Sequence, residues 1–205
     1  MQLKEYEPTK LHRTLRKRME KAIVDYQMIE PGDRLLLGVS GGADSMALLH
    51  LFCHGLVLTT PHFYLSTIYV DIGLPHADTE KRNIWKEYMN HSGFDFHLTQ
   101  TRIGETAFAE DRKKNPCFIC SMYRRQRVYE LAEKLNCNKI VYGHHKDDIA
   151  ETLLINIFFG RKIETMHPVQ KIFKGKMHII RPLCYIEEPL IKKLAREAGL
   201  PLLSK

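Results

Sequence analysis

Hydrophobic residues along this chain occur in two patterns that alternate from one end to the other. Short apolar runs bounded by turn residues predict buried strands at 35–39, 65–70, 94–100, 139–143 and 177–181. Apolar residues at helical spacing predict helices at 10–27, 79–91, 121–135, 148–159 and 187–198, and a further helix from Met46. The helix at 148–159 is expected to be amphipathic. This alternation predicts an α/β fold: a doubly wound, mostly parallel sheet with helices on both faces, preceded by an N-terminal basic helix.

The turn between the first strand and its helix reads Ser-Gly-Gly-Ala-Asp-Ser over 40–45. Two glycines allow a sharp turn and leave room for a ligand near the backbone, and N–H groups at a helix start attract an anion. The turn lacks the Gly-Lys-Ser/Thr ending of a Walker loop and the G-x-G-x-x-G of a dinucleotide fold. A capped turn without a ligand is the simpler alternative. The pattern favours a phosphate-binding loop, at the sheet edge where such folds bind ligands.

A second polar turn follows the strand at 139–143 and reads Gly-His-His-Lys-Asp-Asp over 143–148. In a parallel sheet, this turn lies at the same edge as the glycine loop. Ordinary helix capping explains one of Asp147 and Asp148. A second acid beside a phosphate loop that itself carries Asp44 favours magnesium binding or proton transfer. His144 and His145 are expected to pack rather than to bind zinc.

Cys117 and Cys120 form a C-x-x-C pair ahead of a basic helix. Two thiolates at this spacing can bind a metal ion, act as a redox dithiol or form part of an iron–sulfur site, and spacing alone does not choose among these. The pair does not follow a first strand, which argues against a thioredoxin-like role. The other cysteines are isolated: Cys53, Cys137 and Cys184. The first two of these are expected to fill core positions.

The chain has 205 residues, enough for one large domain with a short appendage, and we expect an N-terminal basic helix region at 1–30 before the main domain at 31–205. The 31 Lys and Arg outnumber the 24 Asp and Glu, and the net charge of +7 favours a polyanionic partner. Basic residues gather at 10–21 and 124–127, either as phosphate contacts or as solvated helix faces. The odd cysteine count, and the absence of a signal-like start and of any long apolar run, predict a cytoplasmic protein without a membrane span.

Taken together, these motifs resemble the tRNA 2-thiocytidine synthetase branch of the PP-loop ATP pyrophosphatases. Four blocks carry the likeness in family order and 180–183 extends it: 11–17 through 29–33, 40–45, 117–120 with the arginines at 124 and 125, and 143–148 through 156–162. The resemblance implies an adenine nucleotide alpha hydrolase-like fold, with a PP-loop ATP-binding catalytic domain at 31–205. It also implies ATP-dependent tRNA thiolation, in which a tRNA base, with cytidine favoured, is adenylated with release of pyrophosphate and then receives sulfur.

The resemblance further implies roles for individual residues. The expected ATP contacts are Ser40, Gly41, Gly42, Asp44, Ser45, Val70 and Gly143. The expected catalytic residues are Asp147, Asp148, Arg124, Cys117 and Cys120; of these, Asp148 is expected to hold Mg²⁺ with Asp44, and the two cysteines a [4Fe-4S] cluster. The expected tRNA contacts are Arg13, Arg16, Lys17, Arg18 and Arg125. A cysteine desulfurase or sulfide is the expected sulfur donor.

Two features depart from the family pattern. Position 43, often lysine in this branch, is Ala43, so cationic help to the phosphates must come from elsewhere. Family members also carry a third cluster cysteine after the segment that resembles 199–203, and no matching cysteine precedes Lys205. Either Cys184 or a second subunit of a homodimer supplies this ligand, or the chain is a shortened member of the family.

Two other functions stay open. A lysidine-synthetase-like ligase would adenylate a tRNA base without needing cysteines, and the C-x-x-C pair argues against it. A shortened ATP- and tRNA-binding module would bind ATP without turnover. ATP–pyrophosphate exchange distinguishes such a module from an enzyme.

Overall fold

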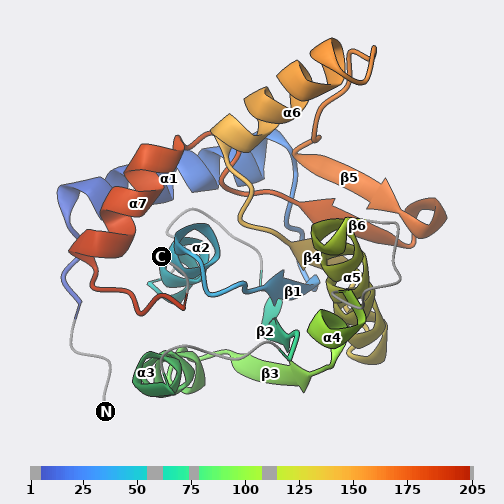
Figure 1. Ribbon diagram of the computed structural model, residues 1–205. Helices are drawn as coiled ribbons and strands as arrows, with labels where there is room; N and C mark the ends of the chain where they lie inside the picture. Colours follow the sequence, from blue (N-terminus) through green and yellow to red (C-terminus); the bar gives the residue numbers. More distant parts are fainter. Residues whose placement is uncertain (1–5, 55–61, 74–78, 108–114, 204–205) are drawn as a thin grey trace.

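The computed structural model describes residues 6–54, 62–73, 79–107 and 115–203. Its strands are β1 Arg34–Gly38, β2 Tyr64–Asp71, β3 Asp95–Gln100, β4 Lys139–Val141, β5 Val169–Ile172 and β6 Met177–Ile180. They form one sheet in the order β3-β2-β1-β4-β6-β5 (Figure 1). β5 is antiparallel to β6, and the other neighbouring strands are parallel. The predicted mostly parallel sheet is confirmed.

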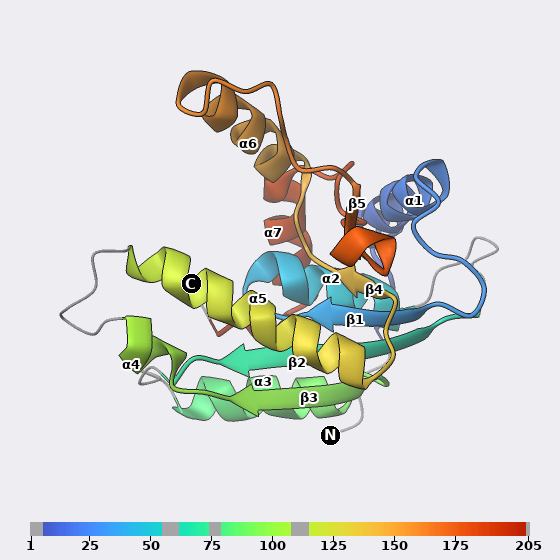
Figure 2. The ribbon, with the colours of Figure 1, turned by 90° about the vertical axis from the view of Figure 1, so that its right-hand side faces the viewer.

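Helices cover both faces of this sheet (Figures 1 and 2). They are α1 Lys10–Asp25, α2 Ala43–Cys53, α3 Thr79–Asn90, α4 Ile103–Ala107, α5 Pro116–Lys134, α6 Lys146–Phe158 and α7 Glu188–Glu197, with a 3-10 turn η1 at Phe173–Gly175. The larger core cluster joins α1, α2, α3 and α7 to one face of the sheet. A smaller cluster joins α5 to the other face. Within the described residues, no helix is both long and apolar enough to cross a membrane.

The central strand β1 is buried on both faces because consecutive residues in it are apolar. Leu35, Leu36 and Leu37 have no exposed surface. Leu35 and Leu37 belong to the cluster that includes α1, α2 and α7, whereas Leu36 belongs to the cluster beneath α5. Such a run is typical of a parallel strand covered by helices on both sides.

The N-terminal basic helix is present as α1. Its N-cap residue Thr9 accepts a hydrogen bond through its hydroxyl from the backbone N–H of His12 at 3.1 Å. Leu15, Met19 and Ile23, one helical face, are buried in the same cluster as β1 and α7. α1 therefore shares the main core, and the division of the chain at residue 30 stays a prediction.

The chain reverses its course across the sheet at β1. It runs outward from β1 to β2 and β3 and returns to the other side of β1 as β4. Leu37 of β1 pairs with Val141 of β4, so the turns after these two strands lie side by side. Sheets of this kind bind ligands at such a point, beyond the carboxyl ends of the strands. The topology thus brings the glycine loop and the 143–148 turn together, as predicted.

The largest difference from the expected structure concerns α6. The helix predicted at 148–159 is present, but none of its residues is buried, and Ile149 in its first turn packs only partly buried against the larger core cluster. α6 projects from the body of the molecule (Figure 2). Its exposed apolar side chains are Leu154, Ile155, Ile157 and Phe158. The sequence pattern also does not predict α4, β5 or η1, because elements this short show no clear period.

Candidate active site

A cavity of about 830 Å³ lies beyond the carboxyl ends of β1 and β4. The glycine loop, the C-x-x-C pair, the arginines behind it and the 143–148 turn all reach this cavity. The expected site residues that line it are Ser40, Asp44, Ser45, Val70, Cys117, Cys120, Arg124, Arg125, Gly143 and Asp148. The lining does not include Gly41, Gly42, Asp147, Arg13, Arg16, Lys17 or Arg18. The fold therefore gathers most of the expected ATP-binding and catalytic residues, and it places the α1 cations elsewhere.

The glycine loop is held in shape by its own hydroxyl groups. Ser45 Oγ accepts a hydrogen bond from the Ser40 N–H and donates one to the Gly42 carbonyl, both at 3.1 Å. Ser40 Oγ lies 3.1 Å from Ser45 Oγ and accepts a hydrogen bond from the Gly42 N–H at 3.2 Å. Gly42 is the N-cap of α2, where no side chain caps the helix. The start of α2 is therefore suited to an anionic ligand.

Two neighbouring segments pack closely against this loop, and glycine is required at the two points of contact. A β-carbon at Gly143 would lie 3.0 Å from the Asp44 carbonyl carbon and 3.1 Å from the Ser45 backbone nitrogen. A β-carbon at Gly41 would lie 2.8 Å from the side chain of Leu203, and the Gly41 φ of 81° also favours glycine. The Leu203 N–H donates a hydrogen bond to the Gly41 carbonyl at 2.9 Å. The turn after β4 and the segment after α7 thus fix the loop between them.

Three carboxylates lie beside the ring of His145: Asp147 near its Nδ1, at 3.6 Å, and Asp44 and Asp148 near its Nε2. The ring Nε2 is 3.9 Å from Asp44 Oδ1 and 3.4 Å from Asp148 Oδ2. Burial raises the pKa of Asp44; His145 opposes this shift, whereas the negative charges of Asp148 and Glu188 add to it. Asp44 Oδ1 is buried and has no hydrogen-bond partner among the described residues. An unpartnered carboxylate oxygen near a second carboxylate is a donor set that fits a divalent cation.

The two acids of the 143–148 turn have different structural tasks. Asp148 Oδ2 accepts a hydrogen bond from the His145 N–H at 2.8 Å, and His145 Nδ1 accepts one from the Asp148 N–H at 3.4 Å, a reciprocal cap on α6. Asp147 Oδ2 accepts a hydrogen bond from the Glu188 N–H at 2.7 Å, in the first turn of α7. Asp148 therefore caps a helix and also faces the cavity, whereas Asp147 ties α6 to α7.

The C-x-x-C pair lies in the first turn of a helix. α5 begins at Pro116, five residues before the predicted start at Ser121, and the Asn115 side chain caps it by accepting a hydrogen bond from the Cys117 N–H at 2.9 Å. Cys117 is exposed and Cys120 is half-buried, and both line the cavity. Two accessible thiols facing one cavity fit as part of a metal or sulfur site. Within the described ranges, no three His, Cys, Asp or Glu side chains are grouped to hold a metal ion.

The other three cysteines are packed in the interior. Burial raises the pKa of Cys53 to about 12 and that of Cys184 to about 11, and it also raises the pKa of Cys137. Cys137 belongs to the cluster beneath α5, and Cys53 packs against the larger cluster. The expected core roles of Cys53 and Cys137 are confirmed. Cys184 is buried in the larger cluster and does not line the cavity, so its position offers no support for a ligand role.

The cavity also contains a histidine–arginine pair that the sequence pattern does not single out. Arg181, a buried residue directly after β6, donates a hydrogen bond from Nε to His144 Nδ1 at 3.3 Å and one from its NH2 group to Gln170 Oε1 at 3.1 Å. Burial lowers the pKa of His144, and the positive charge of Arg181 lowers it further. Their positions in the sequence could have indicated that both residues lie at the site, because each follows a strand at the carboxyl edge of the sheet.

Comparison with known proteins agrees with this geometry. A family model described as a PP-loop domain matches residues 10–203. The tRNA-cytidine(32) 2-sulfurtransferase of Aeromonas hydrophila subsp. hydrophila is 34% identical over 203 residues, which cover 97% of this chain and 65% of that protein. The protein of the same name from Paracidovorax citrulli is 36% identical over 200 residues, which cover 97% of this chain and 64% of that protein. The chain thus spans slightly less than two thirds of the length of these two relatives.

Solved structures show the same fold. The U34-tRNA thiolase NcsA from Methanococcus maripaludis, described with its [4Fe-4S] cluster, aligns with a TM-score of 0.74 at 20% identity, over 94% of this chain and 64% of that one. The NH3-dependent NAD synthetase from Campylobacter jejuni aligns with a TM-score of 0.55 at 12% identity, over 95% of this chain and 75% of that one. With a glycine loop at the switch point of the sheet and a family match over 10–203, this chain belongs to the PP-loop family.

Proposed function

We propose that this chain is the catalytic PP-loop part of an ATP-dependent tRNA sulfurtransferase. It would adenylate a tRNA base, with cytidine as the favoured base, and exchange the base oxygen for sulfur. The observation that most supports this proposal is the shared cavity, because one space is lined by the glycine loop, two thiols and three arginines. The names of the two longer relatives point to the same class of reaction.

In this proposal, ATP binds with its phosphates at the start of α2. The hydroxyls of Ser40 and Ser45 and the first N–H groups of α2 would contact phosphate oxygens. Asp44 and Asp148 are the residues that would hold Mg²⁺, which when bound neutralises phosphate charge. Position 43 is alanine, so Arg124 and Arg125 on α5, which line the cavity, are the cations that would act on the reacting phosphates.

The proposed reaction has two steps. The carbonyl oxygen of the base attacks the α-phosphorus of ATP, forming an O–P bond while the bond to pyrophosphate breaks. Sulfur at the oxidation level of sulfide then attacks the same base carbon, and AMP leaves with the former carbonyl oxygen. No oxidant or reductant is consumed, because sulfide replaces oxygen without a change in oxidation level.

Cys117 and Cys120 are the residues that would hold the sulfur side of the reaction. Two soft ligands within one helical turn, open to a cavity, fit as two ligands of an iron–sulfur cluster. When bound, a [4Fe-4S] cluster would offer an iron site for sulfide. Free sulfide supplies this sulfur directly, whereas the persulfide sulfur from a cysteine desulfurase first takes two electrons from a thiol reductant to reach the same oxidation level. Asn115 caps the start of α5 and so fixes the turn that carries both thiols into the cavity lining.

The experiment that tests this function measures pyrophosphate and thiolated base from one tRNA transcript. The wild-type protein should release pyrophosphate only with tRNA present, and Asp44→Asn should lower that rate by about 100-fold with unchanged circular dichroism. Asp95→Asn, a change at an exposed acid on β3, is the matched control and should keep the rate. Cys117→Ser should keep pyrophosphate release and lose the thiolated product. A normal rate in Asp44→Asn, or pyrophosphate without thiolation in every form, would reject the proposal.

A further inference from the structure

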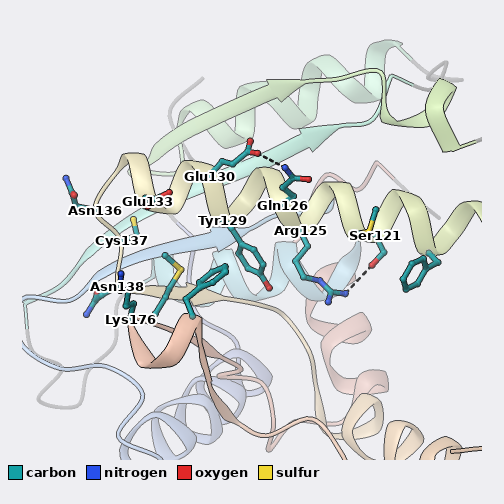
Figure 3. Close-up of a pocket in the computed structure, with 14 residues that line it drawn as sticks. Ser121, Arg125, Gln126, Tyr129, Glu130, Glu133, Asn136, Cys137, Asn138 and Lys176 are labelled. Atoms are coloured by element: carbon teal, nitrogen blue, oxygen red, sulfur yellow. Dashed lines mark hydrogen bonds between the residues drawn. The ribbon is translucent and has the colours of Figure 1, made fainter.

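A second cavity, of about 980 Å³, lies next to the first, and the proposed reaction does not use it (Figure 3). One wall is α5, the other is η1 with the start of β6, and the turn from α5 to β4 closes one end. Ser121, Arg125 and Tyr129 line both cavities. The two cavities therefore lie side by side along α5.

Aromatic side chains stand on both walls of the second cavity. Phe118, next to Cys117, is 59% exposed, and Phe173 on the opposite wall is 53% exposed. The Tyr129 ring lies edge-on to Phe173 with 5.2 Å between ring centroids. Exposed rings on facing walls are surfaces on which a flat heterocycle can stack.

The backbone holds Phe173 in an unusual conformation. Phe173 and Lys174 have φ values of 50° and 58°, in the left-handed region that bulky residues rarely adopt. Consecutive residues in this region carry a conformational cost, and such strain gathers at ligand-binding sites. The ring of Phe173 in this turn lines the cavity, and Lys176, directly after the turn, lines it as well.

Positive charge surrounds the cavity. Arg125 and Lys176 line it, and Lys171 and Lys174 are exposed on β5 and η1. None of these four forms an ion pair with another residue in the part of the chain that the structure covers. Unpaired cations near aromatic rings attract phosphates to the place where bases stack.

The carboxylates of the cavity do not cancel this charge. Glu130 accepts a hydrogen bond from Gln126 at 2.9 Å and forms an ion pair with Arg127 at 2.6 Å (Figure 3). Glu133 lies one helical turn further along α5, beside the closed end at Asn136. At the end shared with the first cavity, Arg125 is therefore a cation without a carboxylate partner in the described part of the chain.

We propose that the second cavity binds an unpaired nucleobase of the RNA substrate, a neighbour of the base that enters the ATP cavity. This inference rests on the proposed function, because it takes tRNA as the substrate. The base stacks on Phe118 or Phe173, and its flanking phosphates contact Arg125, Lys174 or Lys176. The cavity thereby fixes the register of the RNA and delivers the target base to the glycine loop.

The test uses RNA hairpins that carry 2-aminopurine at an unpaired position on one side or the other of the target cytidine. Stacking on an aromatic ring quenches the fluorescence of this base. Wild-type protein should quench one of the two probes, and Phe118→Ala and Phe173→Ala should lose the quenching and bind about 10-fold more weakly. The matched control is Phe159→Ala, at an 84% exposed phenylalanine beyond α6, which should change neither quantity.

A second variant keeps the inference testable if the Phe118→Ala or Phe173→Ala protein fails to fold. Lys174→Gln/Lys176→Gln leaves the rings in place and should lower the slope of log affinity against log salt by about 1.5 while quenching persists. Wild-type quenching and affinity in both aromatic variants, or equal losses in Phe159→Ala, would overturn the inference. A third outcome would also overturn the inference: the wild-type protein quenches neither probe, and it self-associates in sedimentation in a way that Phe173→Ala abolishes. That result would assign the cavity to a second copy of the chain.

Failure of the proposed function gives a different result. If the chain binds RNA but does not adenylate it, quenching is normal and tRNA-dependent pyrophosphate is absent. If the chain adenylates tRNA but the second cavity is not used, pyrophosphate is normal and the aromatic variants match the wild type.

Discussion

The chain has two basic regions, and their neighbours distinguish them. On α1, three of the cations are paired with carboxylates: Arg16 with Glu20, Arg18 with Glu187 and Lys21 with Asp25. On α5 and the turn around η1, Arg125, Lys174 and Lys176 have no such partner within the described residues. A run of basic residues in a sequence therefore gives the number of cations, and only the fold shows which of them can meet a phosphate.

The largest effect should come from the cavity arginines. Arg124→Gln/Arg125→Gln should lower tRNA-dependent pyrophosphate release about 100-fold, because both arginines line the cavity in which we propose that the phosphates react. Arg16→Gln/Arg18→Gln removes the same charge from α1 and should change the rate by less than about 3-fold, because both arginines are already paired. Equal losses in the two double variants would show that the paired cations matter as much as the free ones.

The second effect concerns how α1 is fastened to α2. The rings of His12, His50, His54 and Tyr6 pack together with centroids 4.4 to 5.6 Å apart. His12 and His50 are buried, and burial lowers their pKa to about 4 and about 3. Because the folded state favours the neutral rings, their contribution is complete above the unfolded pKa of about 6.5 and is lost as the pH falls toward 4.

We therefore expect each of the two rings to lower the free energy of unfolding by about 3 kcal/mol between pH 7 and pH 4, at about 1.4 kcal/mol per pKa unit. Urea titrations at both pH values measure this change. His12→Phe/His50→Leu should remove most of the pH dependence in this range. An undiminished pH dependence in that variant would assign it to carboxylates instead.

The third effect is on salt dependence of tRNA binding. Lys171→Gln/Lys174→Gln/Lys176→Gln should lower the log–log salt slope by about 2, since each phosphate contact contributes about 0.7 to 0.9. Arg13 and Lys17, for which no ion pair is found in the described part, should together contribute about 1.5 if α1 binds tRNA as the resemblance implies. No change on removal of those two would leave α1 as a solvated helix face.

The smallest effect should come from loss of an exposed ion pair between α1 and the residue before α7. Arg18 and Glu187 form an ion pair whose side chains are 41% and 35% exposed. Exposed pairs of this kind contribute about 0.2 to 1 kcal/mol, so Arg18→Gln should lower the free energy of unfolding by no more than that. A loss above about 2 kcal/mol in urea titration would mean that the pair fastens α1 to α7 more strongly than exposed pairs do.

The parts of the fold that are predictable from sequence depend on local pattern. The apolar run Leu35–Leu37 and the glycines that follow it predict a buried strand and its turn from local sequence alone. The same holds for the strand before Gly143. Parallel pairing then puts both turns at one sheet edge, which is why it could be predicted that the residues of these two turns lie close together.

The other features depend on contacts between distant segments. Whether α6 packs or projects is decided by what lies beneath it, and its sequence does not show this. Leu203 reaches Gly41 and Arg181 reaches His144 only through the folded sheet. The His50-x-x-x-His54 spacing does predict that two rings share a face of α2, but the third ring, from α1, is visible only in the structure.

The most direct test of the central claim follows the oxygen of the base. A tRNA transcript with oxygen-18 at the carbonyl of its target cytidine is incubated with ATP, Mg²⁺, sulfide and the reconstituted protein, and the AMP formed is analysed by mass spectrometry. We predict that AMP carries the heavy oxygen, one atom for each thiolated base, because the base oxygen attacks the α-phosphorus and leaves with AMP. Thiolated tRNA accompanied by AMP without the heavy oxygen would contradict adenylation of the base in this cavity.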